Sequence, residues 1–123
     1  MAKFKIFCTY KTILNESDFP DCLIKINEQS VLSRDEFLRE VKGCHGILSN
    51  PRCPRIDAEI LEAAGDQLKT ISTSSAGYNY IDTDECSKRG ISVGYLADTF
   101  TGKITHFICL FILINCTFKF YEF

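Results

Sequence analysis

The amino-acid sequence predicts an α/β fold built on a mainly parallel sheet. Short apolar runs with the pattern of strands alternate along the chain with amphipathic segments that have the pattern of helices. Capping residues begin these helical segments and glycines end them. Because neighbouring parallel strands need a long crossover connection, this alternation is typical of a layered domain of sheet and helices.

Five segments have the pattern of strands. The first mixes charged and apolar residues and then turns apolar, and the others are short apolar runs bounded by turn residues. The connection over residues 10–20 is short for a crossover helix and ends in Pro20, so we expect its helix to be stunted or absent. The expected strands are residues 3–9, 22–26, 46–49, 68–73 and 91–93.

Three segments have the pattern of helices, and their ends are marked. Ser33 and Glu36 form a capping box before an apolar face. Gly65 is the expected left-handed stop of the second helix. In the third helix, acids in the first turn and Lys88 and Arg89 in the last turn match the helix dipole. The expected helices are residues 33–43, 56–67 and 81–90.

Composition restricts the classes of function. A chain of 123 residues, 46% hydrophobic and 24% charged, is ordinary for one globular domain. The net charge of -2 and the scattered basic residues give no footprint for nucleic acid. Seven cysteines without a C-x-x-C pair predict reduced thiols and no metal site. The start has no long apolar leader, so we expect a cytoplasmic protein.

The character of the chain changes after Gly102. Residues 107–114 are wholly apolar and aromatic residues crowd the end. The apolar stretch of about fifteen residues is shorter than the roughly 20 that a membrane helix needs. A buried or orphan segment is therefore favoured over a membrane tail.

Residues 74–77, Ser-Ser-Ala-Gly, lie between the fourth expected strand and the third expected helix. In open parallel sheets, ligands bind beyond the carboxyl ends of the strands. Backbone amides near a helix start hold anions such as carboxylate or phosphate, and a glycine lets the ligand approach closely. A plain tight turn is the alternative, and the local pattern leaves both open.

Other motifs for chemistry are missing from the sequence. It contains no G-x-G-x-x-G. His45 opens an expected buried strand and is interpreted as structural, whereas His106 lies in the apolar C-terminal segment. Neither histidine has a placed partner for a catalytic triad. We therefore assign no residue of this chain to catalysis, cofactor binding or metal binding.

Two stretches, "GCHGILSN" and "ILEAAGDQLKTISTSSAGYNYIDTDECSKRGISVGYLADT", resemble the D-2-hydroxyacid dehydrogenase family, above all its glyoxylate and hydroxypyruvate reductases. The resemblance is strong over residues 44–101, weaker over residues 3–43, and absent from Lys103 onward. The residues that carry it most specifically are Ala63-Ala64-Gly65, Leu68-Lys69, Ile71-Ser72-Thr73, Ser75-x-Gly77, Lys88-Arg89-Gly90-Ile91, Val93-Gly94-Tyr95 and Asp98.

The resemblance implies a flavodoxin-like substrate domain with helices on both faces of its sheet, which relatives join to a Rossmann cofactor domain. It implies reduction of a small 2-oxo acid, such as glyoxylate or hydroxypyruvate, by NADH or NADPH in a homodimeric enzyme. The loop that matches Ser75, Ala76 and Gly77 would bind the substrate carboxylate through backbone amides. The loop at residues 48–50 faces the same cleft in the family.

The chain also departs from the family. Asn79 stands where the family usually has Asp, and Ala97 replaces a common proline. The dinucleotide loop and the catalytic arginine, glutamate and histidine of the family have no counterpart here. We therefore expect residues 1–102 to form an incomplete substrate domain and residues 103–123 to be an aberrant apolar tail. Because Gly-Lys can be encoded by a splice-donor sequence, intron read-through is one hypothesis for this tail.

Two functions remain open at this point. In one, the chain is the substrate-domain portion of an NAD(P)-linked oxidoreductase acting on the CH–OH group of donors, and it is inactive alone. In the other, it is a non-catalytic truncated isoform that binds small carboxylates or pairs with full-length subunits. A receiver-type signalling module would need clustered acids at the strand ends, which the sequence does not supply.

Overall fold

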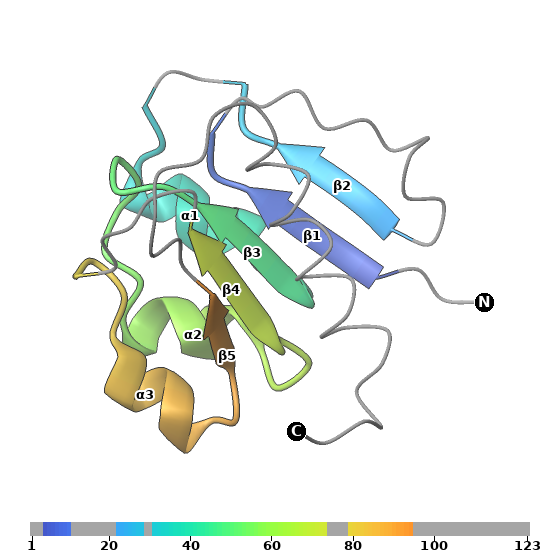
Figure 1. The fold of residues 1–123 in the computed structure, drawn as a ribbon. Coiled ribbons are helices and arrows are strands. Elements are labelled where there is room, and N and C mark those ends of the chain that lie inside the picture. Colours follow the sequence, from blue (N-terminus) through green and yellow to red (C-terminus); the bar gives the residue numbers. More distant parts are fainter. Residues whose placement is uncertain (1–3, 11–21, 29–30, 74–78, 95–123) are drawn as a thin grey trace.

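A computed structural model gives the fold and describes residues 4–10, 22–28, 31–73 and 79–94 (Figure 1). Every expected strand and helix is confirmed, with its ends shifted by a few residues. The helices are shorter than expected because the expected ranges include the capping residues and, for the second helix, residues beyond Gly65. The elements are β1 (Phe4–Cys8), β2 (Cys22–Ile26), α1 (Arg34–Glu40), β3 (Gly46–Ser49), α2 (Ala58–Ala64), β4 (Thr70–Thr73), α3 (Thr83–Lys88) and β5 (Ser92–Gly94).

The strands form one sheet in the order β2-β1-β3-β4-β5, and each neighbouring pair is parallel. This is the strand order of flavodoxin-like folds, so the expected fold class is confirmed. Parallel pairing also brings the carboxyl ends of the strands to one edge, as the arrowheads of β1, β3 and β4 show in Figure 1. The connection between β1 and β2, where a stunted helix was expected, lies outside the described residues.

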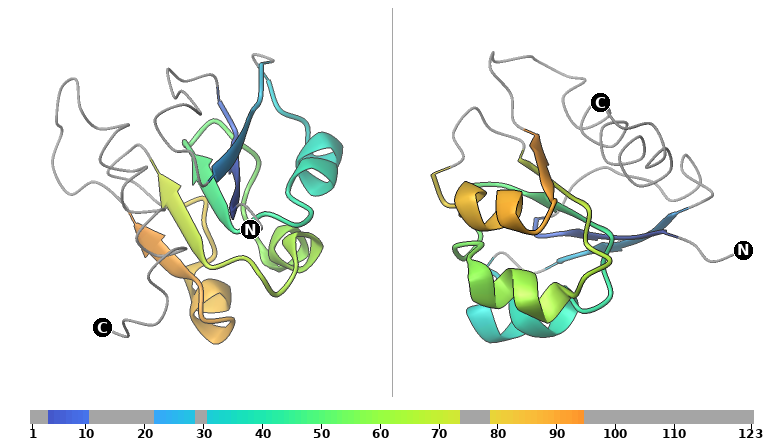
Figure 2. Two further views of the ribbon diagram at one scale, coloured as in Figure 1. Left: turned by 90° about the vertical axis from the view of Figure 1, so that its right-hand side faces the viewer. Right: turned by 90° about the horizontal axis from the view of Figure 1, so that it is seen from below.

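The helices α1, α2 and α3 lie on the same side of the sheet (Figure 2). Residues from all three helices belong to one buried cluster with the sheet, including Phe37 of α1, Ile60 of α2 and Cys86 of α3. The expected helix on the opposite face does not fall within the part of the chain that the structure describes.

A row of apolar side chains crosses the sheet beneath the helices. Phe7, Ile47 and Ile71 are partners in register on β1, β3 and β4, and their exposed fractions are 1%, 0% and 0%. Val93 continues the row on β5 and is partly buried. Side chains alternate between the two faces of a strand, so this register places one apolar residue of each of β1, β3, β4 and β5 under the helix layer, whereas β2 has Lys25 at this position.

Helix ends are fixed by the residues that the sequence marks. The Ser33 hydroxyl accepts from the backbone N–H of Glu36, which confirms the Ser33 half of the capping box. The Glu36 carboxylate accepts from the Ser33 hydroxyl. Asp57 caps α2 by accepting from the N–H of Ile60. Gly65 ends α2 with φ 100° and ψ 174°. The stop is confirmed. The left-handed helical conformation expected there is wrong, because the ψ of Gly65 is extended and a turn follows in which the Leu68 N–H donates to the Gly65 carbonyl at 3.3 Å.

Candidate functional site

The site predicted from the sequence begins where β4 ends. Ser49 and Thr73, the last residues of β3 and β4, are partners in register and both have an exposed fraction of 0%. The predicted carboxylate-binding residues Ser75, Ala76 and Gly77 follow almost at once. They lie outside the described residues, so their role stays a prediction. Thr73 before the segment and Asn79 after it are described, so the positions where the segment begins and ends are known.

A chain of hydroxyl groups joins both strand ends to Tyr80. The Ser49 Oγ lies 3.2 Å from the backbone oxygen of Ser72, to which it donates, and 2.7 Å from the Tyr80 hydroxyl oxygen. Because Ser49 has a single proton to donate, Tyr80 is the donor to Ser49. The Tyr80 hydroxyl also bonds the side chain of Thr73, which then acts as the donor.

Burial keeps the Tyr80 hydroxyl neutral. Removal of the phenol from water raises the pKa of Tyr80 to about 12, and this effect exceeds the opposing effect of the hydrogen bonds with Ser49 and Thr73. Tyr80 is therefore a protonated hydrogen-bond donor at physiological pH. It cannot serve there as a general base.

The backbone around Tyr80 is held by the segment that follows β3. The N–H of Ile56 donates to the Tyr80 carbonyl at 2.9 Å, and the N–H of Asp82 donates to the Ile56 carbonyl at 2.9 Å. Arg55 adds a side-chain bond from Nη1 to the Asn79 carbonyl at 3.1 Å. The exit of segment 74–78 is thus fixed by a short parallel bridge between Ile56 and Ile81.

Three buried thiols carry no charge at neutral pH. Burial raises the pKa of Cys53, beside the strand ends, to about 12. It raises the pKa of Cys44 and of Cys86 to about 11. Because the thiolate is the nucleophile and the metal ligand, these values argue against reactive cysteines at these positions. Among the described residues, no three His, Cys, Asp or Glu side chains gather as metal ligands would.

His45 lies at the opposite end of β3 from Ser49. Its Nδ1 accepts a hydrogen bond from the backbone N–H of Lys5 at 3.0 Å, and its ring stands edge-on to Phe4 with centroids 5.4 Å apart. The structural role expected for His45 is confirmed.

Ser49 and Tyr80 are the described site residues that the sequence did not assign. The family resemblance pointed to residues 48–50 without identifying a contact. A polar residue that ends an otherwise apolar strand, and a tyrosine just beyond a run of small residues, were the available signals. Neither signal tells which distant hydroxyl will be the partner.

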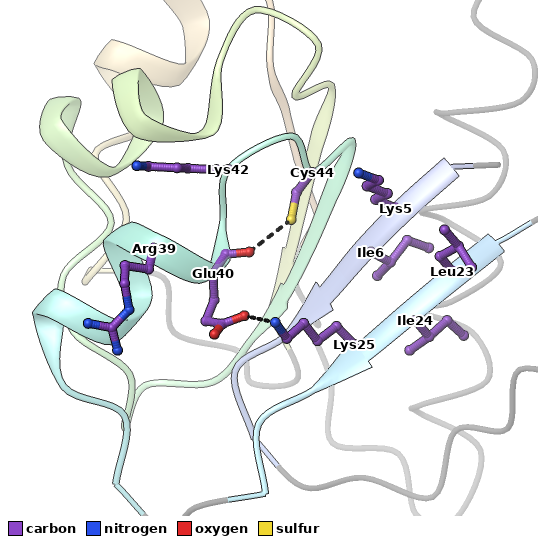
Figure 3. Close-up of a pocket in the computed structure, with 9 residues that line it drawn as sticks. All are labelled: Lys5, Ile6, Leu23, Ile24, Lys25, Arg39, Glu40, Lys42 and Cys44. Carbon is purple, nitrogen blue, oxygen red and sulfur yellow. Dashed lines mark hydrogen bonds and ion pairs between the residues drawn. The ribbon is translucent and has the colours of Figure 1, made fainter. Parts of the chain in front are cut away.

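A pocket of about 420 Å³ lies beside α1, toward β1 and β2 (Figure 3). Its lining is rich in cations, but Lys25 forms an ion pair with Glu40. The side chains of Arg39 and Lys42 lead away from the strands in Figure 3. The pocket therefore offers no convergent set of charges for a ligand. Its lining residues are Lys5, Ile6, Leu23, Ile24, Lys25, Arg39, Glu40, Lys42 and Cys44.

Comparisons with known proteins agree on one family. A profile described as "D-isomer specific 2-hydroxyacid dehydrogenase, catalytic domain" matches residues 10–105. The human protein named glyoxylate reductase/hydroxypyruvate reductase is 41% identical over 81 residues, which cover 66% of this chain and 24% of the human one. A glyoxylate reductase of Thermofilum pendens is 38% identical over 81 residues, covering 66% of this chain and 23% of its own.

Solved structures share the fold. The crystal structure of a protein from Thermus thermophilus superimposes with a TM-score of 0.65 at 26% identity, over 73% of this chain and 29% of that one. The present chain spans about a quarter of the length of the two curated relatives described above. Within the ranges that the structure describes, no helix has the length and apolar character to cross a membrane.

Proposed function

Because this chain belongs to the D-isomer specific 2-hydroxyacid dehydrogenase family, we propose that it is the substrate-domain portion of a glyoxylate/hydroxypyruvate reductase-like enzyme. Such an enzyme is an NAD(P)-dependent oxidoreductase acting on the CH–OH group of donors. The observation that carries the proposal is the family match over residues 10–105, which covers β2 to β5 and the segment after β4. We propose that the chain is inactive alone.

In this proposal the segment after β4 binds the substrate. Backbone amides of Ser75, Ala76 and Gly77 would hold the carboxylate of a small 2-oxo acid such as glyoxylate or hydroxypyruvate. Gly77 leaves room for the carboxylate to approach the backbone. Support comes from the position of the segment, because parallel sheets bind ligands beyond the carboxyl ends of their strands.

The dinucleotide cofactor that the family implies does not fit the described ends of β1 and β3. A pyrophosphate site needs a glycine-rich turn between a strand and a helix N-terminus. β1 instead continues into Thr9-Tyr10, and β3 continues into Asn50-Pro51. The part of the reaction that we propose for this chain is therefore limited to binding and orienting the 2-oxo acid.

Two measurements on the purified 123-residue chain test the proposal. First, oxidation of NADH and NADPH is followed with glyoxylate or hydroxypyruvate, and we expect no turnover above the protein-free rate. Second, oxalate, an unreactive small dicarboxylate, is titrated while backbone amide NMR signals are recorded. We expect the signals of residues 75–77 to move. Turnover by the pure chain would overturn its inactivity, and oxalate without effect on these amides would overturn the carboxylate loop.

A side chain placed at Gly77 provides the matched test. We expect Gly77→Val to weaken oxalate binding by at least about tenfold, because the added methyl groups occupy space that the carboxylate needs. Ser92→Val, at an exposed position of β5, is the control and should bind oxalate as the unsubstituted chain does. Co-purification with a full-length family member, rather than ligand binding, would favour the truncated-isoform alternative.

A further inference from the structure

We propose that the apolar run at residues 107–114 packs against the face of the sheet opposite the helices and completes the core of the domain from within the same chain. This inference goes beyond the proposed substrate site and does not depend on it. It gives a structural function to the C-terminal segment, for which the family resemblance offers no counterpart.

The strand register defines the surface that this run would cover. The helices α1, α2 and α3 all lie on one side of the sheet, over the row of apolar side chains described above (Figure 2). Because side chains alternate along a strand, the neighbours of that row in the chain point to the other side. We call this surface the second face. Its residues on β1, β3 and β4 are Ile6, Cys8, Leu48, Thr70 and Ser72.

The second face is buried, although no described element lies over it. The exposed fractions of its five residues lie between 0% and 4%. Ile6, Cys8 and Leu48 are apolar, yet none of them belongs to the buried cluster that the helices share. Ser92 continues the face on β5 and is exposed, so the cover ends at β4. Since this burial occurs within a single chain, the cover is a segment of the chain outside the described ranges.

The connection from β1 to β2 accounts for only part of the cover. It steps across the sheet in the opposite direction from the helical connections, so the right-handed rule for parallel strands assigns residues 11–21 to the second face, over β1 and β2. β4 lies about 10 Å beyond β1 at the usual strand spacing, and a helix with its side chains is only about 10–12 Å wide. A further segment is therefore needed over β3 and β4.

The run at residues 107–114 has the length for this position. Residues 95–106 link it to the end of β5 and can span roughly 40 Å, which is ample for a return over the sheet. The run itself measures about 12 Å as a helix and about 27 Å as a strand, whereas the four residues of β4 measure about 13 Å. Residues 74–78 begin and end near the carboxyl edge and are too short to follow β4 and return.

Two hydroxyl groups indicate that the cover over β4 is apolar. Thr70 Oγ1 and Ser72 Oγ are buried and have no hydrogen-bond partner within the described part of the chain. A polar segment would satisfy them, since buried hydroxyl groups are normally paired. An apolar segment shields them from solvent and offers neither donor nor acceptor side chains. Residues 107–114 contain no charged, hydroxyl or amide side chain, whereas residues 11–21 contain several of each kind or of related polar kinds.

The first experiment measures whether charges in the run expose the second face. Leu110→Asp/Phe111→Asp places two charges in the middle of the run, where burial of a carboxylate is unfavourable. The full-length variant is pulsed with N-ethylmaleimide, and the labelled thiols are identified by peptide mass spectrometry. Cys8 reports on the second face, and Cys86, which is buried with α3, reports on global unfolding.

We expect alkylation of Cys8 to accelerate by at least about tenfold in this variant while Cys86 stays protected, because only the second face opens. Phe120→Asp/Tyr121→Asp, the matched control, adds the same charges beyond the run and should leave the rate for Cys8 within about twofold of the unsubstituted chain. Unchanged protection of Cys8 in the first variant, or equal acceleration in the control, would overturn the proposal.

A second measurement decides the matter if both thiols react in the first variant, as they would in an unfolded chain. Thr70→Val keeps the shape of the side chain and removes a hydroxyl without a partner. Under an apolar cover, we expect the melting temperature of the full chain to rise by at least about 2 °C. An unchanged or lower melting temperature would indicate a polar cover such as residues 11–21 and would overturn the proposal.

Discussion

At the scale of single residues, neutral hydroxyl groups form the hydrogen bonds at the carboxyl ends of β3 and β4. Tyr80, Ser49 and Thr73 hold one another by hydrogen bonds. The neighbouring thiol of Cys53 stays protonated because burial raises its pKa to about 12. The shifted pKa values of Tyr80 and Cys53 therefore both lie far above 7. This chemistry suits binding and placement, which agrees with a domain that we propose to be inactive alone.

Tyr80 gives the protein a pH dependence in alkaline solution. Its pKa is raised from 10 in the unfolded chain to about 12 in the fold, so the folded state favours the protonated phenol. The stabilisation is complete below pH 10 and is lost as the pH rises from 10 to 12. We expect the difference in unfolding free energy between the unsubstituted chain and Tyr80→Phe to fall by about 2 kcal/mol across this window.

Urea denaturation at about pH 8, pH 10 and pH 11.5 measures this difference across the window that the raised pKa sets. The buried cysteines titrate in the same range, but they are present in both chains and cancel in the comparison. A difference that stays constant with pH would show that the Tyr80 phenol ionises equally well in the folded and unfolded chains.

At the scale of elements, α1 and α2 are joined by one arginine. The Arg34 guanidinium donates from Nη2 to both carboxylate oxygens of Asp57, at 2.8 Å and 2.9 Å, and also to Glu59. Asp57 is at the same time the N-cap of α2. Burial alone would raise the pKa of Asp57, but the bonds with Arg34 and with the Ile60 N–H outweigh it and lower the pKa.

Asp57→Ala should therefore lower the free energy of unfolding more than an ordinary surface substitution does. We expect a loss of about 1–2 kcal/mol of unfolding free energy at neutral pH, since both the helix cap and the link to α1 are removed. The lowered pKa means that this contribution is complete above the pKa of an unfolded Asp and is lost as the pH falls through the folded value. The difference in unfolding free energy between the unsubstituted chain and Asp57→Ala should therefore become smaller at acid pH.

Glu59→Ala is the control for this measurement. Glu59 contacts the same guanidinium but its side chain is 63% exposed, so its loss should change the unfolding free energy by less than about 1 kcal/mol. Equal effects of Glu59→Ala and Asp57→Ala in urea denaturation would show that the cap adds nothing beyond a surface ion pair.

Local features of the elements could be predicted from the sequence, and contacts between elements could not. The capping box of Ser33 and the glycine stop at Gly65 depend on neighbours within a few residues, so the sequence displays them directly. The bond between Ser49 and Tyr80 joins residues 31 positions apart. It depends on the register of β3 with β4, which no local pattern specifies. The resemblance pointed to the segment before Tyr80 but not to this hydrogen bond.

At the scale of the whole molecule, the sheet is stabilised by the row of apolar residues beneath the helices. Ile71 is central in this row, with an exposed fraction of 0% and partners on both sides. We expect Ile71→Ala to lower the unfolding free energy by about 2–5 kcal/mol and Ile71→Val by about 0.5–1.5 kcal/mol. Urea denaturation of the full chain measures both values, and the smaller change remains measurable if the larger one prevents folding.

Leu23→Ala provides the comparison on β2. Leu23 is 42% exposed and lies outside the buried cluster, so we expect a cost below about 1 kcal/mol. A cost at Leu23 equal to that at Ile71 would show that the edge of the sheet is buried in solution. The helix-covered row would then not be the main source of stability.

The strand order also has a consequence for synthesis of the chain. β1 and β2 come before the other strands in the chain and are partners, and β3, β4 and β5 extend the same side of the sheet in sequence order. Each of these later strands pairs with a strand that precedes it in the chain. Assembly can therefore keep pace with translation, and no early strand has to wait for the last one. The pairing partner of every strand up to β4 is complete before β5 appears.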